Sequence, residues 1–158
     1  MATTTTDLYK AVMGKGEDFA IEIGTLPSED VLDPRWEDSQ YYNKKKKIWI
    51  TSRADVKFVD GKVQPGGGTS LHDKPKWFSV PDFWIPAGTE YSDEIHIQKD
   101  DDETASPRNP KLKGYHYQLE VRTAMTMETF KGYLSNMARA AVARQCAIGK
   151  KEPIEVKK

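Results

Sequence analysis

The stretch that decides the fold reads YHYQLEV at residues 115–121 and TMETFKGYLSNMARAAVARQCAIG at residues 126–149. In the first part, apolar and aromatic residues alternate with polar ones, which is the period of a half-buried β-strand. In the second part, apolar residues recur at steps of three and four from Met127 to Ala141, and Thr126 precedes them as a helix N-cap. The two parts predict a strand followed by one long amphipathic helix whose apolar stripe lies in the core.

Shorter strands are expected earlier in the chain. Short or alternating apolar runs predict them at residues 8–12, 19–23, 77–80, 83–85 and 95–98. Asp60-Gly61 between apolar residues predicts a tight hairpin. Residues 25–43 and 99–110 carry prolines and many acidic residues without a clear period, so we expect loops there. Many short strands and one late helix predict an α+β domain built around a β core.

The length of the chain, 158 residues, fits one soluble globular domain, which we place at residues 1–150, with a frayed tail at residues 151–158. The single cysteine, Cys146, excludes an internal disulfide and favours a reducing compartment. No stretch approaches the roughly 18 apolar residues of a membrane span, and residues 1–9 lack the pattern of a secretory signal. We therefore expect a cytoplasmic protein with no membrane partner.

Charge is distributed unevenly although the formal net charge is zero. Residues 1–103 carry 13 basic and 20 acidic residues, and the remainder carries 11 basic and 4 acidic residues. The basic C-terminal part can meet an anionic ligand, a nucleic acid or an acidic protein, or it can pair with the acidic part of its own fold. Four consecutive lysines, at residues 44–47, are typical of a solvated strand edge and, in fewer cases, of an anion site.

Three common kinds of site are disfavoured. The histidines at positions 72, 96 and 116 and the one cysteine lack the spacing of zinc ligands, so we expect no metal. The Gly-rich loop at residues 65–71 lacks the Gly-Lys-Ser/Thr ending of a phosphate-binding P-loop. Ser70 lacks the Gly-x-Ser-x-Gly elbow of an acyl-transfer nucleophile.

The Gly-rich loop has two interpretations. Its three glycines let the backbone come close to a planar ligand, and the hydroxyls of Thr69 and Ser70 can orient the polar groups of that ligand. The same composition is also typical of an ordinary turn, in which the hydroxyls satisfy backbone groups. His116, on the polar face of its strand, is likewise either a functional residue or a solvated histidine.

An ordered series of motifs favours the functional interpretation. It comprises Leu-Tyr-Lys-Ala-Val at residues 8–12, Gly-Gly-Thr-Ser at 67–70, Ile-Pro and Gly-Thr within 85–89, and matching positions from Asn109 through His116-Tyr117 to Gln145. The series resembles the ADP-ribosyltransferase-like effector toxins of bacterial type VI secretion, a small cytotoxic family neutralised by a cognate immunity protein.

The resemblance implies the split β-sheet fold of the toxin ADP-ribosyltransferases, with the long helix in the C-terminal half. It implies an NAD-dependent enzyme that binds NAD as cosubstrate in the cleft between two small sheets and breaks the bond between nicotinamide and ribose. The ADP-ribose then passes to an unidentified acceptor, or NAD is hydrolysed. A cognate immunity protein is the implied partner, and type VI delivery into the cytoplasm of a target cell is the implied route.

The resemblance also implies the site residues. Ser70, His116 and Gln98 are expected to be catalytic. Gly67, Gly68 and Thr69 are expected to bind the cofactor, with Gly68, Thr69 and Ser70 on its nicotinamide side. His116 is expected to contact the adenosine ribose or the amide. Lys10 is expected to meet the phosphates, and Tyr117 to stack on the cofactor or to lie in the core. Lys10 replaces the arginine of the family, and a single ammonium cannot form the bidentate contact of a guanidinium. No glutamate stands at a motif of its own, and Gln98 or Lys99 occupies the nearest region.

Two other functions remain open from the residues alone. The first is a metal-independent ribonuclease toxin with His116 as general base and Lys10 or Arg122 at the phosphate. The second is a non-catalytic binding module whose basic C-terminal half docks an acidic protein.

Overall fold

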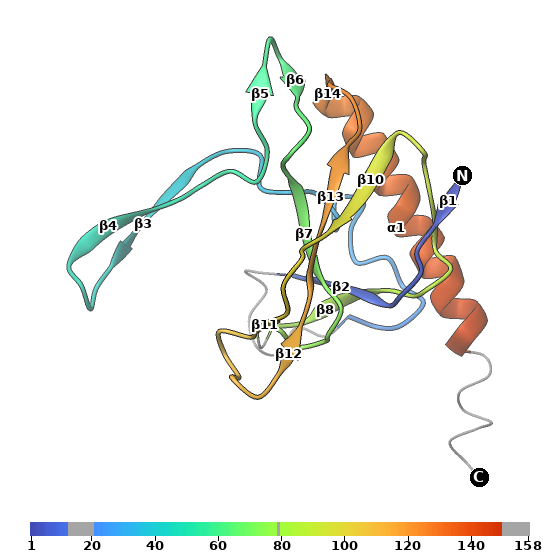
Figure 1. Ribbon diagram of the computed structural model, residues 1–158, viewed down its shortest axis with the longest axis horizontal. Helices are drawn as coiled ribbons and strands as arrows, with labels where there is room; N and C mark the ends of the chain where they lie inside the picture. Colours follow the sequence, from blue (N-terminus) through green and yellow to red (C-terminus); the bar gives the residue numbers. More distant parts are fainter. Residues whose placement is uncertain (13–20, 79, 150–158) are drawn as a thin grey trace.

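The computed structural model describes residues 1–12, 21–78 and 80–149 (Figure 1). The strands of this part are β1 (Ala2–Thr3), β2 (Leu8–Ala11), β3 (Ser39–Asn43), β4 (Ile48–Ser52), β5 (Phe58–Val59), β6 (Lys62–Val63), β7 (Gly68–His72), β8 (Asp82–Ile85), β9 (Glu90–Tyr91), β10 (Ile95–Lys99), β11 (Thr104–Ala105), β12 (Lys113–Gly114), β13 (His116–Val121) and β14 (Met125–Thr126). The helix α1 spans Met127–Gly149. The predicted α+β class is confirmed.

A five-stranded antiparallel sheet forms the centre of the molecule, in the order β10-β13-β7-β2-β8. Strand residues of one parity point into a continuous apolar cluster that includes Leu71, Phe83 and Leu119. Phe130 and Leu134 of α1 belong to the same cluster, so the helix covers this face of the sheet. The opposite face carries polar side chains, because β13 and β7 alternate as the sequence predicted.

Helix α1 begins where its sequence predicted. The Thr126 hydroxyl accepts a hydrogen bond from the Thr129 amide at 3.2 Å, which confirms the N-cap, and Glu128 lies in the first turn, where an acidic group is favourable. At the other end, the buried Gln145 accepts from the Gly24 amide at 2.7 Å and donates to the Trp84 carbonyl. The helix thereby fixes both a loop and the strand β8.

Leu134 is 1% exposed in the middle of this interface. Leu134→Ala is expected to lower the free energy of unfolding by about 2 to 5 kcal/mol, because it removes buried methyl groups and leaves a cavity. Urea unfolding of both proteins measures the difference. An unchanged midpoint would mean that this face of α1 does not pack on the sheet.

The described residues form three hairpins outside the central sheet, β5-β6, β3-β4 and β11-β12. In the first, Asp60 and Gly61 join β5 to β6 with positive φ angles of 52° and 74°, which confirms the predicted tight turn. In the second, β3 pairs with β4 and projects away from the body (Figure 1). The four lysines form the turn of this second hairpin, so they lie at its tip and not along a strand edge.

Four expectations about local structure were wrong. Residues 104–105, within the segment 99–110 expected as loop, form the short strand β11, which pairs with β12. Residues 21–23 form no strand, and Phe19 lies outside the described residues. Trp77 and Phe78 lie in a turn, where Trp77 is buried by contact with a neighbouring histidine ring. Residues 39–43, expected as loop, form β3, because pairing with β4 supplies the order that their composition does not. The tail predicted at residues 151–158 also lies outside the described part.

Candidate functional site

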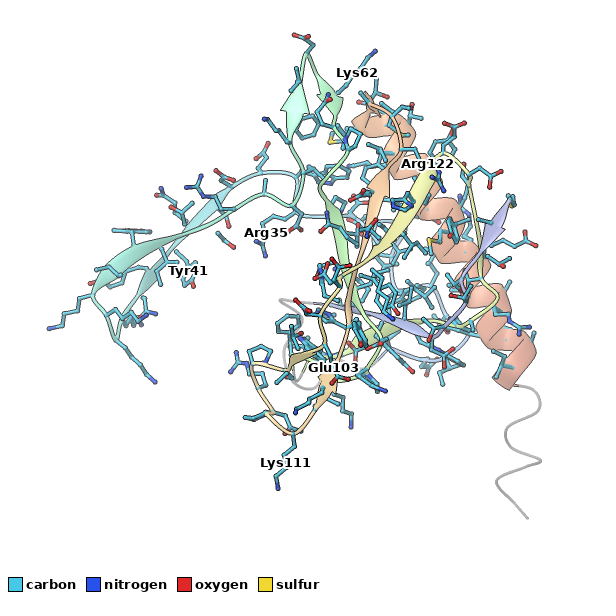
Figure 2. All side chains as sticks on the ribbon, in the orientation of Figure 1. Arg35, Tyr41, Lys62, Glu103, Lys111 and Arg122 are labelled. Atoms are coloured by element: carbon cyan, nitrogen blue, oxygen red, sulfur yellow. The ribbon has the colours of Figure 1, made fainter. Side chains whose placement is uncertain are left out.

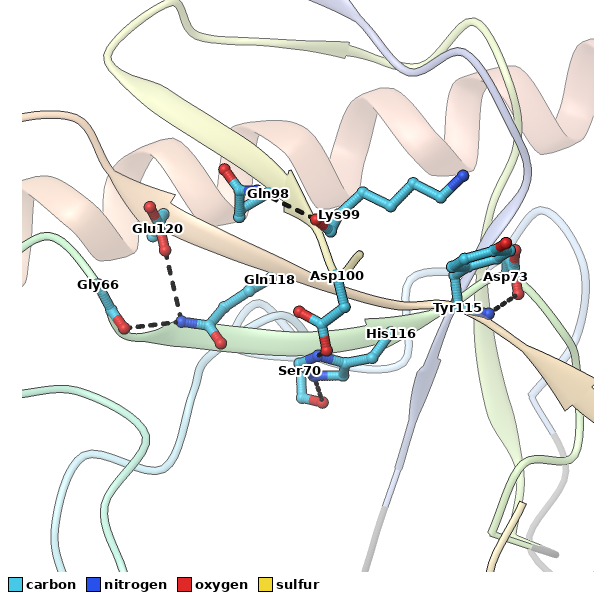
Figure 3. A network of polar contacts seen from close by, with 10 residues as sticks. All are labelled: Gly66, Ser70, Asp73, Gln98, Lys99, Asp100, Tyr115, His116, Gln118 and Glu120. Carbon is cyan, nitrogen blue, oxygen red and sulfur yellow. Dashed lines mark hydrogen bonds and ion pairs between the residues drawn. The ribbon is translucent and has the colours of Figure 1, made fainter. Parts of the chain in front are cut away.

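Three polar side chains from separate segments meet on the polar face of the central sheet. Ser70 lies on β7, His116 begins β13, and Asp100 follows β10 directly. The His116 ring binds Ser70 Oγ through Nε2 at 2.6 Å and Asp100 Oδ2 through Nδ1 at 3.0 Å (Figure 3). The Asp100 amide also donates to the His116 carbonyl at 2.9 Å, which fixes the carboxylate beside the ring. We call this chain of hydrogen bonds the Ser70–His116–Asp100 relay.

The relay defines a direction for proton movement. A carboxylate accepts only, so Asp100 favours the His116 tautomer with its proton on Nδ1. Nε2 then accepts the proton of the Ser70 hydroxyl, and both lone pairs of Ser70 Oγ are available to a ligand. The His116 side chain is 26% exposed, so a ligand can reach the relay from solvent. The arrangement can orient a polar group at Ser70 and take up a proton there.

The rings of His72, Trp77 and Phe78 lie beside the relay, and we call them the aromatic wall. The buried His72 ring stacks on Trp77 with the two centroids 4.6 Å apart, and Phe78 meets His72 edge to face at 5.4 Å. The His72 and His116 rings lie 5.2 Å apart. Burial, and secondarily the neighbouring His116, lowers the pKa of His72 to about 4, so His72 is neutral near pH 7. The wall therefore places uncharged, largely buried rings beside His116.

The titration of His72 gives a testable pH dependence. Its pKa is about 4 in the folded protein and 6.5 as a free side chain, so between these values the unfolded chain binds more protons. The stabilisation from neutral His72 is present above pH 6.5 and is lost as pH falls toward 4. Thermal midpoints measured from pH 7.5 to 4.5 should therefore fall more for the parent than for His72→Phe.

The comparison of the two proteins isolates His72 from other acid-sensitive groups. Burial raises the pKa of the Asp33 and Asp82 carboxyls, and these groups act in the opposite direction, since the folded state then holds protons more tightly. Both carboxyls are present in both proteins, so their effect cancels. Parallel midpoint curves for the parent and His72→Phe would contradict a depressed His72 pKa.

A carboxylate that sequence reasoning did not assign belongs to the same face. On β13, Gln118 stands opposite Ser70, and His116 and Glu120 flank it on the same side of the strand. Glu120 accepts a hydrogen bond from Gln118 Nε2 at 3.4 Å, and this amide also donates to the Gly66 carbonyl at 3.2 Å (Figure 3). The alternation at residues 115–121 was a sufficient signal for Glu120. No sequence signal identified Asp100, because it is one of four consecutive acidic residues.

Two glycines of the Gly-rich segment are required by the close packing of the backbone, whether or not a ligand binds there. A Cβ on Gly68 would lie 1.7 Å from the Leu119 carbonyl oxygen, and one on Gly67 would lie 2.4 Å from the Asp55 carbonyl oxygen. The segment was expected as a loop, but Gly68 begins the strand β7. Close approach to the neighbouring backbone therefore explains both glycines, and their contact with a cofactor stays a prediction.

Three of the predicted cofactor-binding side chains lie on the other face of the sheet. Thr69 is fully buried and donates its hydroxyl to the Leu32 carbonyl. Lys10 donates to the Ala11 carbonyl at 3.0 Å inside a separate cavity that Asp33 and Asp55 also line, and burial lowers its pKa. Tyr117 and Lys99 line another cavity, of about 550 Å³. The reason is the alternation of strand residues, which separates each of them from its neighbour on the polar face.

Of the six predicted site residues other than the glycines, the structure places three on the polar face: Ser70, His116 and Gln98. Gln98 stands opposite Gln118 on the exposed edge strand β10, where it contacts His96 at 3.0 Å. Among the described residues, no group of three or more His, Cys, Asp or Glu side chains is placed to hold a metal ion. No described helix is long and apolar enough to cross a membrane.

Comparison with known proteins assigns the family. The family model of the Tse2 ADP-ribosyltransferase toxin matches residues 17–146, which include β7, β13 and the whole relay. A search among curated proteins finds no match. The strands assembled in sheets and the single C-terminal helix are consistent with an ADP-ribosyltransferase-like fold. Because the match covers most of the chain, the chain belongs to the Tse2 ADP-ribosyltransferase toxin family.

Proposed function

We propose that this toxin uses NAD as its ADP-ribose donor and cleaves it on the polar face of the central sheet. The observation that carries the proposal is the Ser70–His116–Asp100 relay, with its distances of 2.6 and 3.0 Å. The relay ends on a hydroxyl beside an aromatic wall, which are the two features that a nicotinamide ring with its carboxamide needs. Delivery by type VI secretion, action in the cytoplasm of a target cell and neutralisation by a cognate immunity protein are parts of the same proposal.

Ser70 and His116 are the proposed catalytic residues, and Asp100 is a positioning residue. Ser70 Oγ, whose own proton is held by His116, accepts a hydrogen bond from the nicotinamide carboxamide. When the bond between nicotinamide and ribose breaks, its electron pair leaves with nicotinamide and the ribose becomes an oxocarbenium ion. The Glu120 carboxylate, on the same face, stabilises this positive charge. Gln98 supplies a further polar group at the edge of the face.

The second half of the reaction consumes the oxocarbenium ion. A nucleophilic group of the acceptor, or water, forms a bond to the ribose carbon and releases one proton. Ser70 Oγ passes that proton to His116 Nε2, and the Asp100 carboxylate stabilises the resulting imidazolium. The aromatic wall limits the access of water to the nicotinamide side. Transfer and hydrolysis differ only in the identity of the nucleophile.

A substitution at Lys10 tests which face of the sheet the diphosphate reaches. Its side chain leaves β2 on the face opposite to Ser70, in the cavity of Asp33 and Asp55. A diphosphate on the polar face would not contact it. We therefore expect Lys10→Ala to release nicotinamide at the parental rate, whereas a loss of about tenfold or more, restored by Lys10→Arg, would place the diphosphate in the cavity of Lys10.

The experiment that tests the function uses NAD labelled separately in nicotinamide and in the adenylate phosphate. Purified toxin is incubated with this NAD and a whole-cell extract, and free nicotinamide and label on protein or nucleic acid are followed. Release of nicotinamide with macromolecular label shows transfer, and release without such label shows hydrolysis. The purified immunity protein should suppress both. RNA decay without nicotinamide release would overturn the proposal in favour of a ribonuclease.

A further inference from the structure

The hairpin of β3 and β4 has no role in the proposed reaction. We define the basic hairpin as residues 39–53, and Figure 2 shows it with Tyr41 as an arm apart from the central sheet. Its strands pair with each other along their whole length and have at most marginal contact with other described elements. It nevertheless exposes four large apolar side chains: Tyr41, Tyr42, Ile48 and Trp49.

The charge of the basic hairpin is opposite to that of its surroundings. Residues 39–53 contain Lys44, Lys45, Lys46, Lys47 and Arg53 and no acidic residue, although residues 1–103 as a whole are acidic. All four lysines are exposed, and among the described residues none of them forms an ion pair. The positive charge of the tip is therefore not neutralised within the described fold.

The turn holds the lysines in a defined arrangement. Asn43 Oδ1 accepts hydrogen bonds from the amides of Lys45 and Lys46, both at 3.0 Å, and the Lys47 amide donates to the Asn43 carbonyl at 2.7 Å. Lys47 has a φ of 56°, the left-handed conformation that closes the turn. The four ammonium groups thus extend from one fixed turn, which concentrates positive charge at the tip.

An aromatic pair lies directly behind this tip. Tyr42 and Trp49 face each other across the hairpin, with ring centroids 5.5 Å apart and planes at 68°. Trp49 is still 67% exposed, so much of its indole surface is free. A nucleotide base can stack on such a surface, while the adjacent phosphates meet the lysines.

We propose that the basic hairpin binds single-stranded nucleic acid, with phosphates at Lys44–Lys47 and a base on Trp49. An unpaired nucleotide chain matches both features, because a phosphate and a planar ring recur at every step. A bilayer matches them less well. The order from the tip inward is cations first and aromatics second, so insertion of the tip would carry four charges deepest into the hydrocarbon.

The test measures fluorescence anisotropy of fluorescein-labelled 15-nucleotide dT and U oligomers, with the full chain and without NAD. One variant removes the tip charges through Lys44→Gln, Lys45→Gln, Lys46→Gln and Lys47→Asn. A matched control removes four exposed charges elsewhere through Lys57→Gln, Lys62→Gln, Lys111→Gln and Lys113→Gln. A third variant is Trp49→Ala. Asparagine at position 47 keeps the left-handed turn accessible, and equal thermal midpoints establish that the variants are folded.

The tip variant is expected to bind at least about tenfold more weakly than the control, and its slope of log affinity against log salt should fall by up to about 3. Trp49→Ala should lose about 5- to 150-fold in affinity with little change in that slope. Binding of only one oligomer would show which of these two nucleic acids the hairpin accepts.

Three outcomes would overturn the proposal. The first is equal affinity of the tip variant and the control for the oligomers. The second is no binding of either oligomer by the parent protein. The third is tighter binding of the parent protein, through the hairpin, to vesicles of equal phosphatidylcholine and phosphatidylglycerol or to polyglutamate than to the oligomers. Because the assay contains no NAD, its result is independent of whether the toxin cleaves NAD.

Discussion

Ser70→Ala is expected to lower the rate of nicotinamide release from NAD by at least about 100-fold. The substitution removes the oxygen that receives the nicotinamide carboxamide and the only hydroxyl that His116 Nε2 contacts in the relay. Ser70 is only partly buried, so the thermal midpoint should change little. Initial rates of nicotinamide release, measured by chromatography at matched concentrations of folded protein, give the comparison.

Two further variants distinguish a loss of catalysis from a general effect of substitution on the fold. Ser39→Ala makes the same change at an exposed strand position of the hairpin, and it should keep the parental rate. Asp100→Asn keeps the shape of the positioning residue but removes its charge, so it should reduce the rate and shift its pH dependence, because the His116 tautomer is no longer fixed. A Ser70→Ala protein that releases nicotinamide as fast as Ser39→Ala would remove Ser70 from the mechanism.

Gly68→Ala is expected to lower the free energy of unfolding by about 3 kcal/mol or more. The added Cβ would lie 1.7 Å from the Leu119 carbonyl oxygen, and backbone in a paired strand cannot move away without breaking the pairing of β7 and β13. Both strands carry relay residues, so nicotinamide release should fall together with stability. Urea unfolding followed by circular dichroism measures the loss.

Gly132→Ala is the matched control for that substitution. Gly132 lies in α1, and apart from its chain neighbours and the adjacent backbone of the helix, no described atom lies within 4 Å of an added Cβ. Alanine there should stabilise the protein by about 0.5 to 1 kcal/mol through its higher helix propensity. If both variants unfolded at the same urea concentration, the close approach of Gly68 to β13 would not exist in solution.

The parts of the fold that the sequence predicts well are those in which local pattern and tertiary packing agree. The strand of residues 115–121 and helix α1 have strict periods, and both occur where expected. The sequence did not predict strand β3, because its apolar and polar residues do not alternate. Most of the strand is exposed on both faces, so no buried face imposes such a pattern. Its order comes from pairing with β4, which a single segment does not encode.

The candidate site was predictable only in part. Ser70 and His116 were proposed through the family resemblance, and in the structure the two side chains are in contact. The face of the sheet on which each side chain lies was harder to predict. Thr69 directly precedes Ser70 and yet lies in the core, because the Gly-Gly-Thr-Ser segment is largely strand and not loop. Asp100 joins the site only through the pairing of β10 with β13, which the sequence does not reveal.

NAD is proposed to bind on the polar face of the central sheet. All three histidines of the chain, His72, His96 and His116, point to this face, so their ring resonances report on it directly. The decisive measurement is a titration of ¹⁵N-histidine-labelled toxin with carba-NAD, in which a methylene replaces the ribose ring oxygen and prevents cleavage. We expect the His116 and His72 rings to shift in a saturable manner, with a smaller change at His96. Saturable binding of carba-NAD that leaves all three rings unmoved would contradict the account.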